Sequence, residues 1–568
     1  MWALGLALRG AKRRSNLLEQ SRNILNSCHR LILFIQKFLR IIIIKIISIM
    51  NRQKFVEELR KQSETIWDII IIGGGATGLG IALDAATRGY KTLLLEQSDF
   101  AKGTSSRSTK LVHGGVRYMA QGDLLLVMEA LHERGIMLKN APHLTFNQEF
   151  VIPIYTLWDA VMYTVGLKFY DLLAGRLSMG KSYFINRAKT LSRLPLLKSK
   201  GLKGGVVYHD GQFDDSRMAF ALAQTCADKG GLVLNYFKVT RLLKDETGKI
   251  NGARAIDIAS GEEFNLKAKL VINATGVFAD EVARMDNPQS KPTIRPSQGV
   301  HIVLDKSFLQ SDSAIMIPKT DDGRVLFAIP WYNEVVVGTT DTPIDTISLE
   351  PVALDKEVDF ILKTAENYFV KPPRREDILC IFAGLRPLAA NPDNPSSTKE
   401  VSRRHKITLS PSGLLTIIGG KWTTYRLMAE ETIDRAIKAG LLTRVKCVTS
   451  TLKLSALAAN NSSERLHIYG DNAVNIQKMI SENPVSGMPV DPRLPYSIAE
   501  IIWICRNEMP LTVEDILARR TRSLFLNARA SAEIAHEVAD IMAKELGFDA
   551  KWKSEQVETY NQLIKNYI

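Results

Sequence analysis

Runs of consecutive apolar residues indicate an α/β unit near the start of the chain. Residues 68–72 read DIIII, a pattern typical of a strand that is buried on both faces of a parallel sheet. A helical stretch (LGIALDAATRG) follows, and a second strand is predicted over residues 91–95. Two more strand-and-turn units are predicted at residues 270–276 (LVINATG) and near residue 415, where LLTIIGGKWTTYRLMAEETIDRA is typical of a strand, a Gly-Gly turn and a helix.

The pattern changes in the middle and at the end of the chain. Between residues 298 and 379, apolar and polar residues alternate (HIVLDK, VLFAIPW, EVVVGTTD), as in half-buried antiparallel strands. Residues 151–204 form an insertion with an aromatic-rich helical stretch (YTLWDAVMYTVGLKFYDLLAG), and the pattern after residue 436 is helical. We therefore expect an α/β fold with α+β elements: a discontinuous Rossmann-like domain, an antiparallel-sheet substrate domain and a C-terminal helical domain.

These patterns also suggest domain boundaries. A leader and a lead-in helix are expected over residues 1–65, the main body of the protein over 66–435 and the helical domain over 436–568. Within the body, the expected cofactor pieces are residues 66–150, 205–297 and 380–435, and the expected substrate sheet is residues 298–379.

A glycine motif connects the first strand to the first helix. Gly73, Gly75 and Gly78 have the G-x-G-x-x-G spacing, which allows a tight turn, a close approach to a pyrophosphate and close helix–strand packing. The helix N-terminus offers free N–H groups to phosphates. Glu96 follows the second strand, and its separation along the sequence from Gly73 is that expected of the carboxylate that binds ribose hydroxyls. The sequence therefore predicts a dinucleotide site.

The segments that follow favour FAD over NAD. Residues 104–118 (TSSRSTKLVHGGVRY) are rich in hydroxyls and glycines and come shortly after the ribose-binding strand. Three strand-and-turn units that are far apart in the chain can converge on one long cofactor, whereas an NAD site is more compact. A helix N-terminus after Gly419 and Gly420 would stabilise the anionic edge of a reduced flavin.

Charge is concentrated at the N-terminus. The chain has a formal net charge of +14, and residues 1–50 carry nine Lys or Arg and one Glu, which accounts for +8. The remaining chain is only mildly basic and has no basic–aromatic patch, so nucleic acid is not an expected partner. The apolar run over residues 31–49 is interrupted by Lys37, Arg40 and Lys45, which argues against a spanning helix. Three interpretations stay open: an interfacial helix, a mitochondrial-type presequence, or a functional start at Met50, with residues 1–49 not part of the native protein.

Other chemistry is not indicated. The five cysteines are scattered and form no C-x-x-C pair, so a reducing compartment is expected. No EF-hand loop or H-E-x-x-H motif is present, and no metal is predicted. Asp214 and Asp215 precede a helical stretch and are interpreted as helix-capping residues.

Several longer motifs resemble one flavoprotein family. They are HGGVRY, INATG, GTTDT, GLRPL, SRRHKI, GGKWTTYR and EDILARRTRSLFL, and with the glycine motif they run from about residue 66 to residue 526. In this order they resemble the FAD-dependent glycerol-3-phosphate dehydrogenases, within the D-amino-acid-oxidase-like group. One departure is Arg404, where the family commonly carries an acid, so the choice between Arg403 and Arg404 as an anion ligand stays open.

The resemblance implies roles for individual residues. The catalytic positions would be His301, Arg386 and Lys421, and the substrate-binding positions Arg117, Tyr118, Thr340 and Arg403. The cofactor-binding positions would be Gly73, Gly74, Gly75, Ala76, Thr77, Gly78, Glu96, Ser105, Ser106, His113, Gly114, Gly115, Ala274, Thr275, Gly276, Gly420 and Thr423.

The implied reaction is the oxidation of sn-glycerol 3-phosphate to dihydroxyacetone phosphate, with hydride transfer to FAD and electrons passed to a membrane quinone. A histidine is suited to removing the hydroxyl proton near neutral pH, and arginine suits phosphate. The alternatives are an oxidase that uses oxygen, a flavin-binding RNA-modification protein and a membrane scaffold. We expect peripheral attachment to the cytoplasmic face of a bacterial inner membrane, with the mitochondrial inner membrane as the alternative, and leave a homodimer open.

Overall fold

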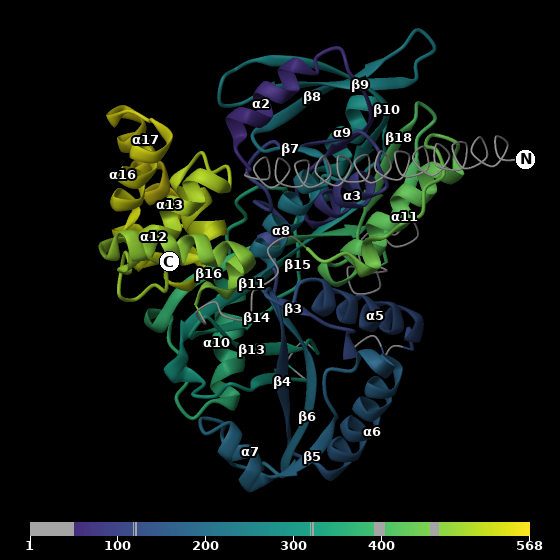
Figure 1. Cartoon of the computed structure of the whole chain (residues 1–568). Helices are drawn as coiled ribbons and strands as arrows, with labels where there is room; N and C mark the ends of the chain where they lie inside the picture. Colours follow the sequence, from purple (N-terminus) through teal and green to yellow (C-terminus); the bar gives the residue numbers. More distant parts are fainter. Residues whose placement is uncertain are drawn as a thin grey trace, which may run out of the picture. The chain divides into compact units, whose positions relative to one another are not determined.

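The structure is a computed structural model that describes residues 50–116, 119, 122–318, 320, 323–390, 404–454 and 465–568 (Figure 1). The basic leader before Met50 lies outside the described residues. The chain enters the fold through helix α2 (Arg52–Lys61), whose N-cap is the side chain of Asn51. Met50 itself is buried.

The first sheet has eight strands and a parallel centre in the order β18-β10-β1-β2-β7. The strands are β1 (Ile66–Ile72), β2 (Thr92–Leu95), β7 (Leu232–Leu234), β8 (Phe237–Lys244), β9 (Ile250–Asp257), β10 (Glu263–Asn273), β17 (Lys406–Leu409) and β18 (Leu414–Ile418). The predicted apolar run lies in β1, where Ile69, Ile70 and Ile71 are fully buried. A strand covered on both faces needs apolar side chains in both directions, which explains the continuous run.

Helices cover this sheet. They are α3 (Ala76–Thr87), α8 (Asp215–Asp228), α9 (Ala279–Asp286) and α11 (Tyr425–Lys438). Close packing requires glycine at two positions of α3. A Cβ on Gly78 would lie 1.9 Å from the carbonyl oxygen of Gly73, and one on Gly80 would lie 2.9 Å from the ring of Tyr425 in α11. The third glycine of the motif therefore has the packing role predicted for it.

The second sheet has ten strands, paired antiparallel except for β4 with β12. The strands are β3 (Leu111–Val112), β4 (Thr145–Ile154), β5 (Tyr183–Asn186), β6 (Gly204–Phe213), β11 (Ile294–Asp305), β12 (Ala314–Ile317), β13 (Leu326–Trp331), β14 (Glu334–Gly338), β15 (Thr342–Pro343) and β16 (Ile378–Ala389). Its longest pairing joins β11 to β16. Strands β3, β6 and most of β16 fall in ranges expected for the cofactor pieces and lie in this sheet, so the domain boundaries stay a prediction.

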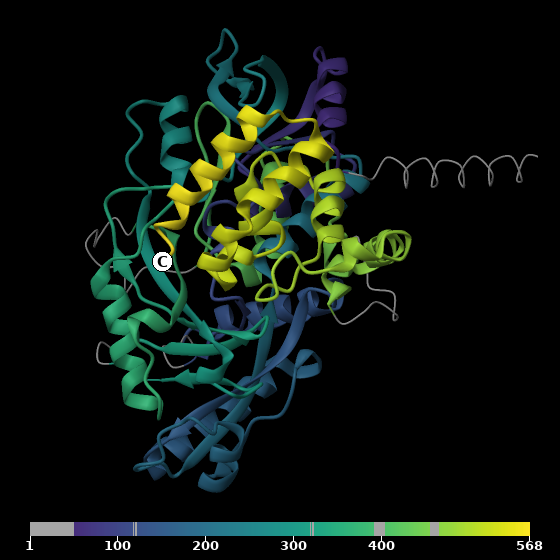
Figure 2. The same cartoon turned by 90° about the vertical axis from the view of Figure 1, so that its left-hand side faces the viewer.

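Further helices pack around the second sheet and at the end of the chain. Those near the second sheet are α5 (Leu124–Asn140), α6 (Leu157–Ala174), α7 (Arg187–Arg193) and α10 (Asp355–Tyr368). The C-terminal helices gather on one side of the two sheets (Figures 1 and 2): α12 (Ala473–Glu482), α13 (Ile498–Asn507), α14 (Ser523–Leu526), α15 (Ala528–Glu533), α16 (Ala535–Leu546) and α17 (Ala550–Ile564). The predicted fold class is confirmed.

Within the described part of the chain, no helix has both the length and the apolar composition needed to cross a bilayer.

A buried ion pair joins the C-terminal part to α8. The guanidinium of Arg217 donates two hydrogen bonds, of 2.7 and 2.9 Å, to the carboxylate of Glu508, and it also lies 4.6 Å from the ring centre of Tyr469. Both charged side chains are buried. Removing one partner of such a pair leaves the other charge desolvated and uncompensated, which is far more costly than losing an exposed pair.

We predict that Glu508→Ala lowers the free energy of unfolding by about 3–5 kcal/mol, because Arg217 would keep its charge in a buried place. Urea unfolding followed by tryptophan fluorescence measures the change. Glu262→Ala is the matched control, since its pair with Arg60 is exposed, and its midpoint should stay near that of the unmodified protein. Equal shifts in the two variants would show that the Arg217–Glu508 pair does not stabilise the fold.

Candidate functional site

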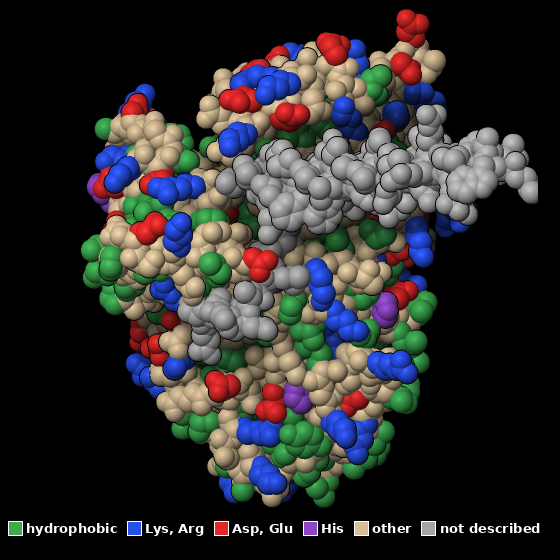
Figure 3. Space-filling view, viewed as in Figure 1, with side chains coloured by type: hydrophobic (Ala, Val, Ile, Leu, Met, Phe, Trp, Pro, Cys, Tyr) green, Lys and Arg blue, Asp and Glu red, His purple; other side chains and the backbone are tan. Residues whose placement is uncertain are grey.

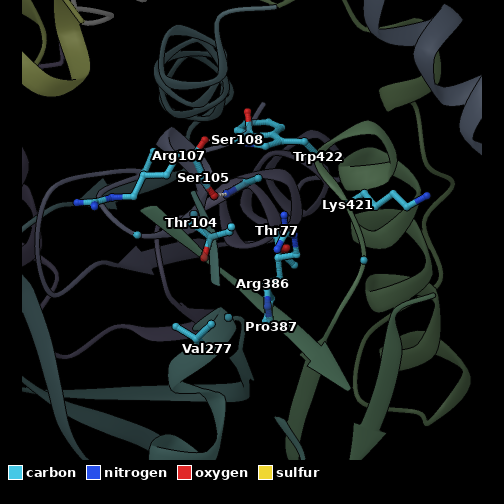
Figure 4. Close-up of a pocket in the computed structure, with 18 of the residues that line it drawn as sticks. Thr77, Thr104, Ser105, Arg107, Ser108, Val277, Arg386, Pro387, Lys421 and Trp422 are labelled. Carbon is cyan, nitrogen blue, oxygen red and sulfur yellow. Dashed lines mark hydrogen bonds between the residues drawn. The ribbon is translucent and has the colours of Figure 1, made fainter. Parts of the chain in front are cut away.

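A cavity of about 470 Å³ is lined by residues from both sheets, which is within the usual size range of ligand pockets. Four segments far apart in the sequence contribute to it: the glycine loop, the segment after β2, strand β16 and the turn after β18. Figure 4 labels one cavity-lining residue from each segment, in the same order: Thr77, Ser105, Arg386 and Trp422.

The glycine loop forms one end of the cavity. Gly73 has a φ of +110°, and a Cβ there would lie 2.7 Å from the carbonyl oxygen of Ala274, at the end of the adjacent strand β10. At Gly75 a Cβ would lie 3.1 Å from Ser105 Oγ, which also accepts a hydrogen bond of 2.9 Å from the N–H of Ala76. The loop therefore leaves no room for side chains where its backbone faces the cavity.

Glu96 supports this loop from the end of β2. Its carboxylate accepts hydrogen bonds from the backbone N–H of Gly74, at 2.6 Å, and of Ser98, at 2.8 Å. Glu96 also lines the cavity, so one carboxylate both orders the loop and faces the space where a ribose was predicted.

Most of the predicted cofactor positions line this cavity. They are Gly73, Gly75, Ala76, Thr77, Glu96, Ser105, His113, Gly115, Ala274, Thr275, Gly276, Gly420 and Thr423. The cavity is not lined by Gly74, Gly78, Ser106 or Gly114. Gly114, for example, contacts the protein interior instead: its N–H donates a hydrogen bond of 2.8 Å to the hydroxyl of Tyr170.

The turn after β18 brings three predicted segments together. The indole N–H of Trp422 donates a hydrogen bond of 2.8 Å to the carbonyl oxygen of Ser105, and the hydroxyl of Thr423 accepts one of 3.3 Å from the N–H of His113. A short helical turn occupies Trp422–Thr424, and α11 begins at Tyr425. The predicted arrangement of a strand, a Gly-Gly turn and a helix is present, although a short helical turn precedes the main helix.

His301 lies on β11 and has an exposed fraction of only 2%. Its Nε2 is 2.9 Å from the hydroxyl of Thr109, and its ring stacks on Phe382 with 4.8 Å between the ring centres. Burial, followed by the positive charges of Lys110 and Arg386, lowers the pKa of His301 well below its ordinary value. These surroundings favour the neutral imidazole, which has one unprotonated ring nitrogen.

Arg386 lies on β16 and is positioned by the loop after β14. Its Nη2 donates hydrogen bonds to Thr339 Oγ1, at 3.1 Å, and to the carbonyl oxygen of Thr340, at 3.0 Å. Thr340 also lines the cavity, but its hydroxyl donates a hydrogen bond of 2.8 Å to the buried carboxylate of Glu357. Lys421 lines the cavity from the turn after β18. The structure thus brings His301, Arg386, Lys421 and Thr340 to one cavity.

The predicted substrate ligands Arg117, Tyr118 and Arg403 lie outside the described residues. Arg404, the other candidate for the anion ligand, is described. Its exposed guanidinium lies 3.3 Å from the carboxylate of Asp123, and it does not line the cavity.

Sequence reasoning missed a buried charge cluster near His301. Asp214 is the N-cap of α8, as predicted, and accepts from the N–H of Arg217. Asp215 has a different role from the predicted one: it is fully buried and pairs with Lys110 and Arg522. No sequence spacing connects these three positions, although Lys110 lies in the hydroxyl-rich stretch that was assigned to the cofactor.

Two family descriptions match the chain. "FAD dependent oxidoreductase" matches residues 68–426, and "C-terminal domain of alpha-glycerophosphate oxidase" matches residues 414–553. The first match spans more than half of the chain and contains every described position discussed for the cavity.

Curated relatives and a solved structure match over nearly the full length. The chain is 41% identical, over 90% of its length and 75% of the relative's, to "Probable glycerol-3-phosphate dehydrogenase, mitochondrial" of Caenorhabditis elegans. It is 40% identical, over 89% of its length and 74% of the relative's, to "Glycerol-3-phosphate dehydrogenase, mitochondrial" of Homo sapiens. The crystal structure of glycerol-3-phosphate dehydrogenase from Bacillus halodurans, complexed with FAD, matches with a TM-score of 0.73 and 30% identity, over 91% of this chain and 97% of that one.

The glycine loop and the buried histidine thus lie in a chain whose relatives named above are all called glycerol-3-phosphate dehydrogenase. This chain belongs to the FAD dependent oxidoreductase family, among the proteins named glycerol-3-phosphate dehydrogenase.

Proposed function

We propose that this protein oxidises sn-glycerol 3-phosphate to dihydroxyacetone phosphate, with FAD as the hydride acceptor. The observation that carries the proposal is a buried, neutral histidine in the same cavity as a dinucleotide-binding glycine loop. The name shared by the relatives supports the choice of substrate.

The cavity suits FAD. At Gly73 and Gly75 a Cβ would meet Ala274 and Ser105, so the loop keeps a bare backbone beside the cavity, as close approach to a pyrophosphate requires. Glu96 faces the expected ribose position, and Trp422 and Thr423 close the far side through their bonds to Ser105 and His113. When bound, FAD supplies the hydride-accepting group of the reaction.

The protein's own residues handle the proton and the charge. We propose that an imidazole nitrogen of His301 accepts the proton of the C2 hydroxyl, a step that typically contributes about 10²–10⁴-fold. Arg386 and Lys421 would stabilise the negative charge that develops on that oxygen. The contacts of Arg386 to Thr339 and Thr340 fix its guanidinium before substrate arrives.

Arg117, Tyr118 and Arg403 are proposed for the phosphate end of the substrate, together with Thr340. Arginine suits this role because its planar fork can donate two hydrogen bonds to one phosphate. Arg404 is the weaker candidate, because its guanidinium is exposed and contacts Asp123.

We further infer that the protein binds a membrane surface through α6. Seven apolar side chains of this helix are exposed, including Leu157 and Trp158 at 74% and Leu172 at 73%. On an α-helix these seven fall within an arc of about 140°, opposite the buried Leu167, Tyr170 and Ala174. The full set is Leu157, Trp158, Val161, Met162, Val165, Phe169 and Leu172.

The charge around this helix suits anionic lipid. Residues 151–204 carry nine Lys or Arg and two Asp, and apolar and basic side chains lie close together at the lower end of the molecule in Figure 3. An amphipathic helix with an exposed Trp and basic neighbours is typical of interfacial binding. A lipid-soluble quinone would be the electron acceptor at such a surface, with oxygen as the alternative. The mitochondrial names of the relatives support the mitochondrial inner membrane over the bacterial membrane that the sequence analysis placed first.

Gly75→Val tests the cofactor site. The new side chain would fill the space between the loop and Ser105, so the purified protein should lose its bound FAD and its yellow colour. Absorbance at 450 nm measures this against Gly166→Val, because a Cβ on Gly166 would meet only Met119 Cε at an ordinary contact distance of 3.6 Å. Stoichiometric FAD in Gly75→Val would exclude the loop as the pyrophosphate site.

His301→Ala tests the base. Anaerobic flavin reduction by glycerol 3-phosphate should slow by about 10²-fold or more, with FAD still bound and substrate affinity little changed. Because the pKa of His301 is lowered, the unmodified enzyme should keep its rate below pH 6.5 and lose it only at lower pH, and this acid limb should be absent in the variant. His132→Ala is the control, since that side chain is exposed. Reduction of His301→Ala at the original rate would assign the proton to another group.

Val165→Glu tests the membrane surface. A charge in the exposed apolar face should weaken sedimentation with vesicles of phosphatidylcholine and cardiolipin, while flavin reduction in solution stays unchanged. Val485→Glu is the matched control, because Val485 is equally exposed in the C-terminal part. Unchanged sedimentation of Val165→Glu would reject α6 as the lipid contact, and a change from dimer to monomer instead would identify a protein interface.

A further inference from the structure

The hydroxyl of Thr109 is the hydrogen-bond partner of His301. Thr109 Oγ1 lies 2.9 Å from Nε2, and within the described residues the other ring nitrogen, Nδ1, is buried without a hydrogen-bond partner. The stacking on Phe382 holds the plane of the ring but does not distinguish between the two orientations that a half-turn about the Cβ–Cγ bond exchanges. The contact with Thr109 therefore distinguishes between these two ring orientations, because it places Nε2 beside the hydroxyl.

The residues on both sides of Thr109 bind one carboxylate. Asp215 accepts hydrogen bonds from the N–H and the hydroxyl of Ser108, at 3.1 and 2.7 Å, and from the ammonium of Lys110, at 2.7 Å. Asp215 and Lys110 are fully buried. Thr109 is thus held between two neighbours that are anchored to the same group.

The C-terminal part completes this anchor. Nη2 of Arg522 donates hydrogen bonds to the carbonyl oxygen of Ser106, at 2.8 Å, and to Asp215, at 3.1 Å. Lys110 donates to the same carbonyl oxygen at 2.8 Å. Because Arg522 belongs to the EDILARRTRS motif, this part of the C-terminal motif reaches the segment that carries Thr109.

Aromatic rings enclose the cluster and join it to His301. The ammonium of Lys110 lies 5.2 Å from the ring centre of Phe382, the same ring that stacks on His301, and 5.3 and 5.4 Å from those of Trp331 and Phe525. Burial and then Arg522 lower the pKa of Lys110 to about 7, although Asp215 opposes this change.

We propose that Thr109 positions His301 as the proton acceptor, and that Asp215, together with Lys110 and Arg522, holds Thr109 in place. The inference rests on the proposed function, in which His301 takes the proton of the C2 hydroxyl. Thr109 is a positioning residue in this account.

The charged groups that face His301 agree with this arrangement. Lys110 lies on the Thr109 side and Arg386 on the β16 side, and both positive charges favour the neutral imidazole. Asp341 lies beyond Arg386, 3.4 Å from its guanidinium, and Asp215 and Arg522 lie beyond Lys110. Among the described residues, burial, Lys110 and Arg386 are what lower the pKa of His301, and all three favour the neutral form of the ring.

The test compares Thr109→Val, which keeps the shape but removes the hydroxyl, with Thr109→Ser, which keeps the hydroxyl. Loss of one positioning hydrogen bond should slow anaerobic flavin reduction by glycerol 3-phosphate about 10-fold in Thr109→Val. FAD content and the substrate dissociation constant should change little, and Thr109→Ser should restore the rate. Equal rates for the unmodified protein and Thr109→Val would overturn the proposal, as would a Thr109→Ser variant as slow as Thr109→Val.

A second readout does not depend on turnover. In protein labelled with ¹⁵N-histidine and freed of FAD, the imidazole signals of His301, assigned by their loss in His301→Gln, should shift in Thr109→Val and return in Thr109→Ser. Unchanged signals would show that Thr109 does not set the ring. If glycerol 3-phosphate reduces no flavin in the unmodified protein, the proposed function fails, while these shifts still decide the Thr109–His301 contact.

The role of Asp215 is tested by a double-mutant cycle. Asp215→Asn should slow flavin reduction, and adding it to Thr109→Val should cause little further loss, because both changes act through the same hydrogen bond. If the fold-loss of rate in the double variant equals the product of the two single fold-losses, Asp215 acts independently of Thr109 and is removed from the proposal. Far-UV circular dichroism and FAD content identify any variant that does not fold.

Discussion

The structure depends on the segment between β2 and β3, which is held by buried, paired charges. This segment crosses from the first sheet to the second, and both sides of the cavity use it. At its start, Asp99 binds the buried guanidinium groups of Arg519 and Arg520, and near its end Arg522 binds Ser106 and Asp215. Buried charges are tolerated only when they are paired and hydrogen-bonded, so these contacts fix the segment in one position.

The functional geometry follows from that constraint. Ser105 lies in the held segment and contacts both the glycine loop and Trp422, which brings the cofactor side together. Four residues later, Thr109 contacts His301 on the second sheet. One stretch of chain therefore contacts both the glycine loop and His301, and the C-terminal region holds that stretch through Arg519, Arg520 and Arg522.

Local patterns in the sequence were sufficient for the elements and for the cofactor end. The continuous apolar run of β1, the three glycines and Glu96 are each local signals with one physical meaning, and the structure places them as a strand, a loop and a supporting carboxylate. The buried cluster around Lys110 could not be predicted in this way. Asp215 and Arg522 are 307 residues apart, and an acid that follows an N-cap residue has the same sequence pattern whether it faces solvent or a buried lysine.

For His301, too, the local sequence predicted the secondary structure but not the contacts with distant residues. The position of His301 on a strand was predicted, but its neutral state arises from burial and from Lys110 and Arg386, which approach from other elements. The family motif selected this histidine among nine, and the structure adds the surroundings that favour its neutral form. Where the motif placed Arg117 and Arg403 at the phosphate, the assignment stays a prediction.

In the proposed reaction, hydride leaves C2 of glycerol 3-phosphate for FAD in this cavity. The most direct measurement is anaerobic mixing of the purified protein with glycerol 3-phosphate, unlabelled or deuterated at C2, with the flavin followed at 450 nm. We expect bleaching with one equivalent of dihydroxyacetone phosphate formed per FAD, slower bleaching with the deuterated substrate and far weaker reaction with glycerol. Bleaching by glycerol at the same rate, or no bleaching by glycerol 3-phosphate, would contradict it.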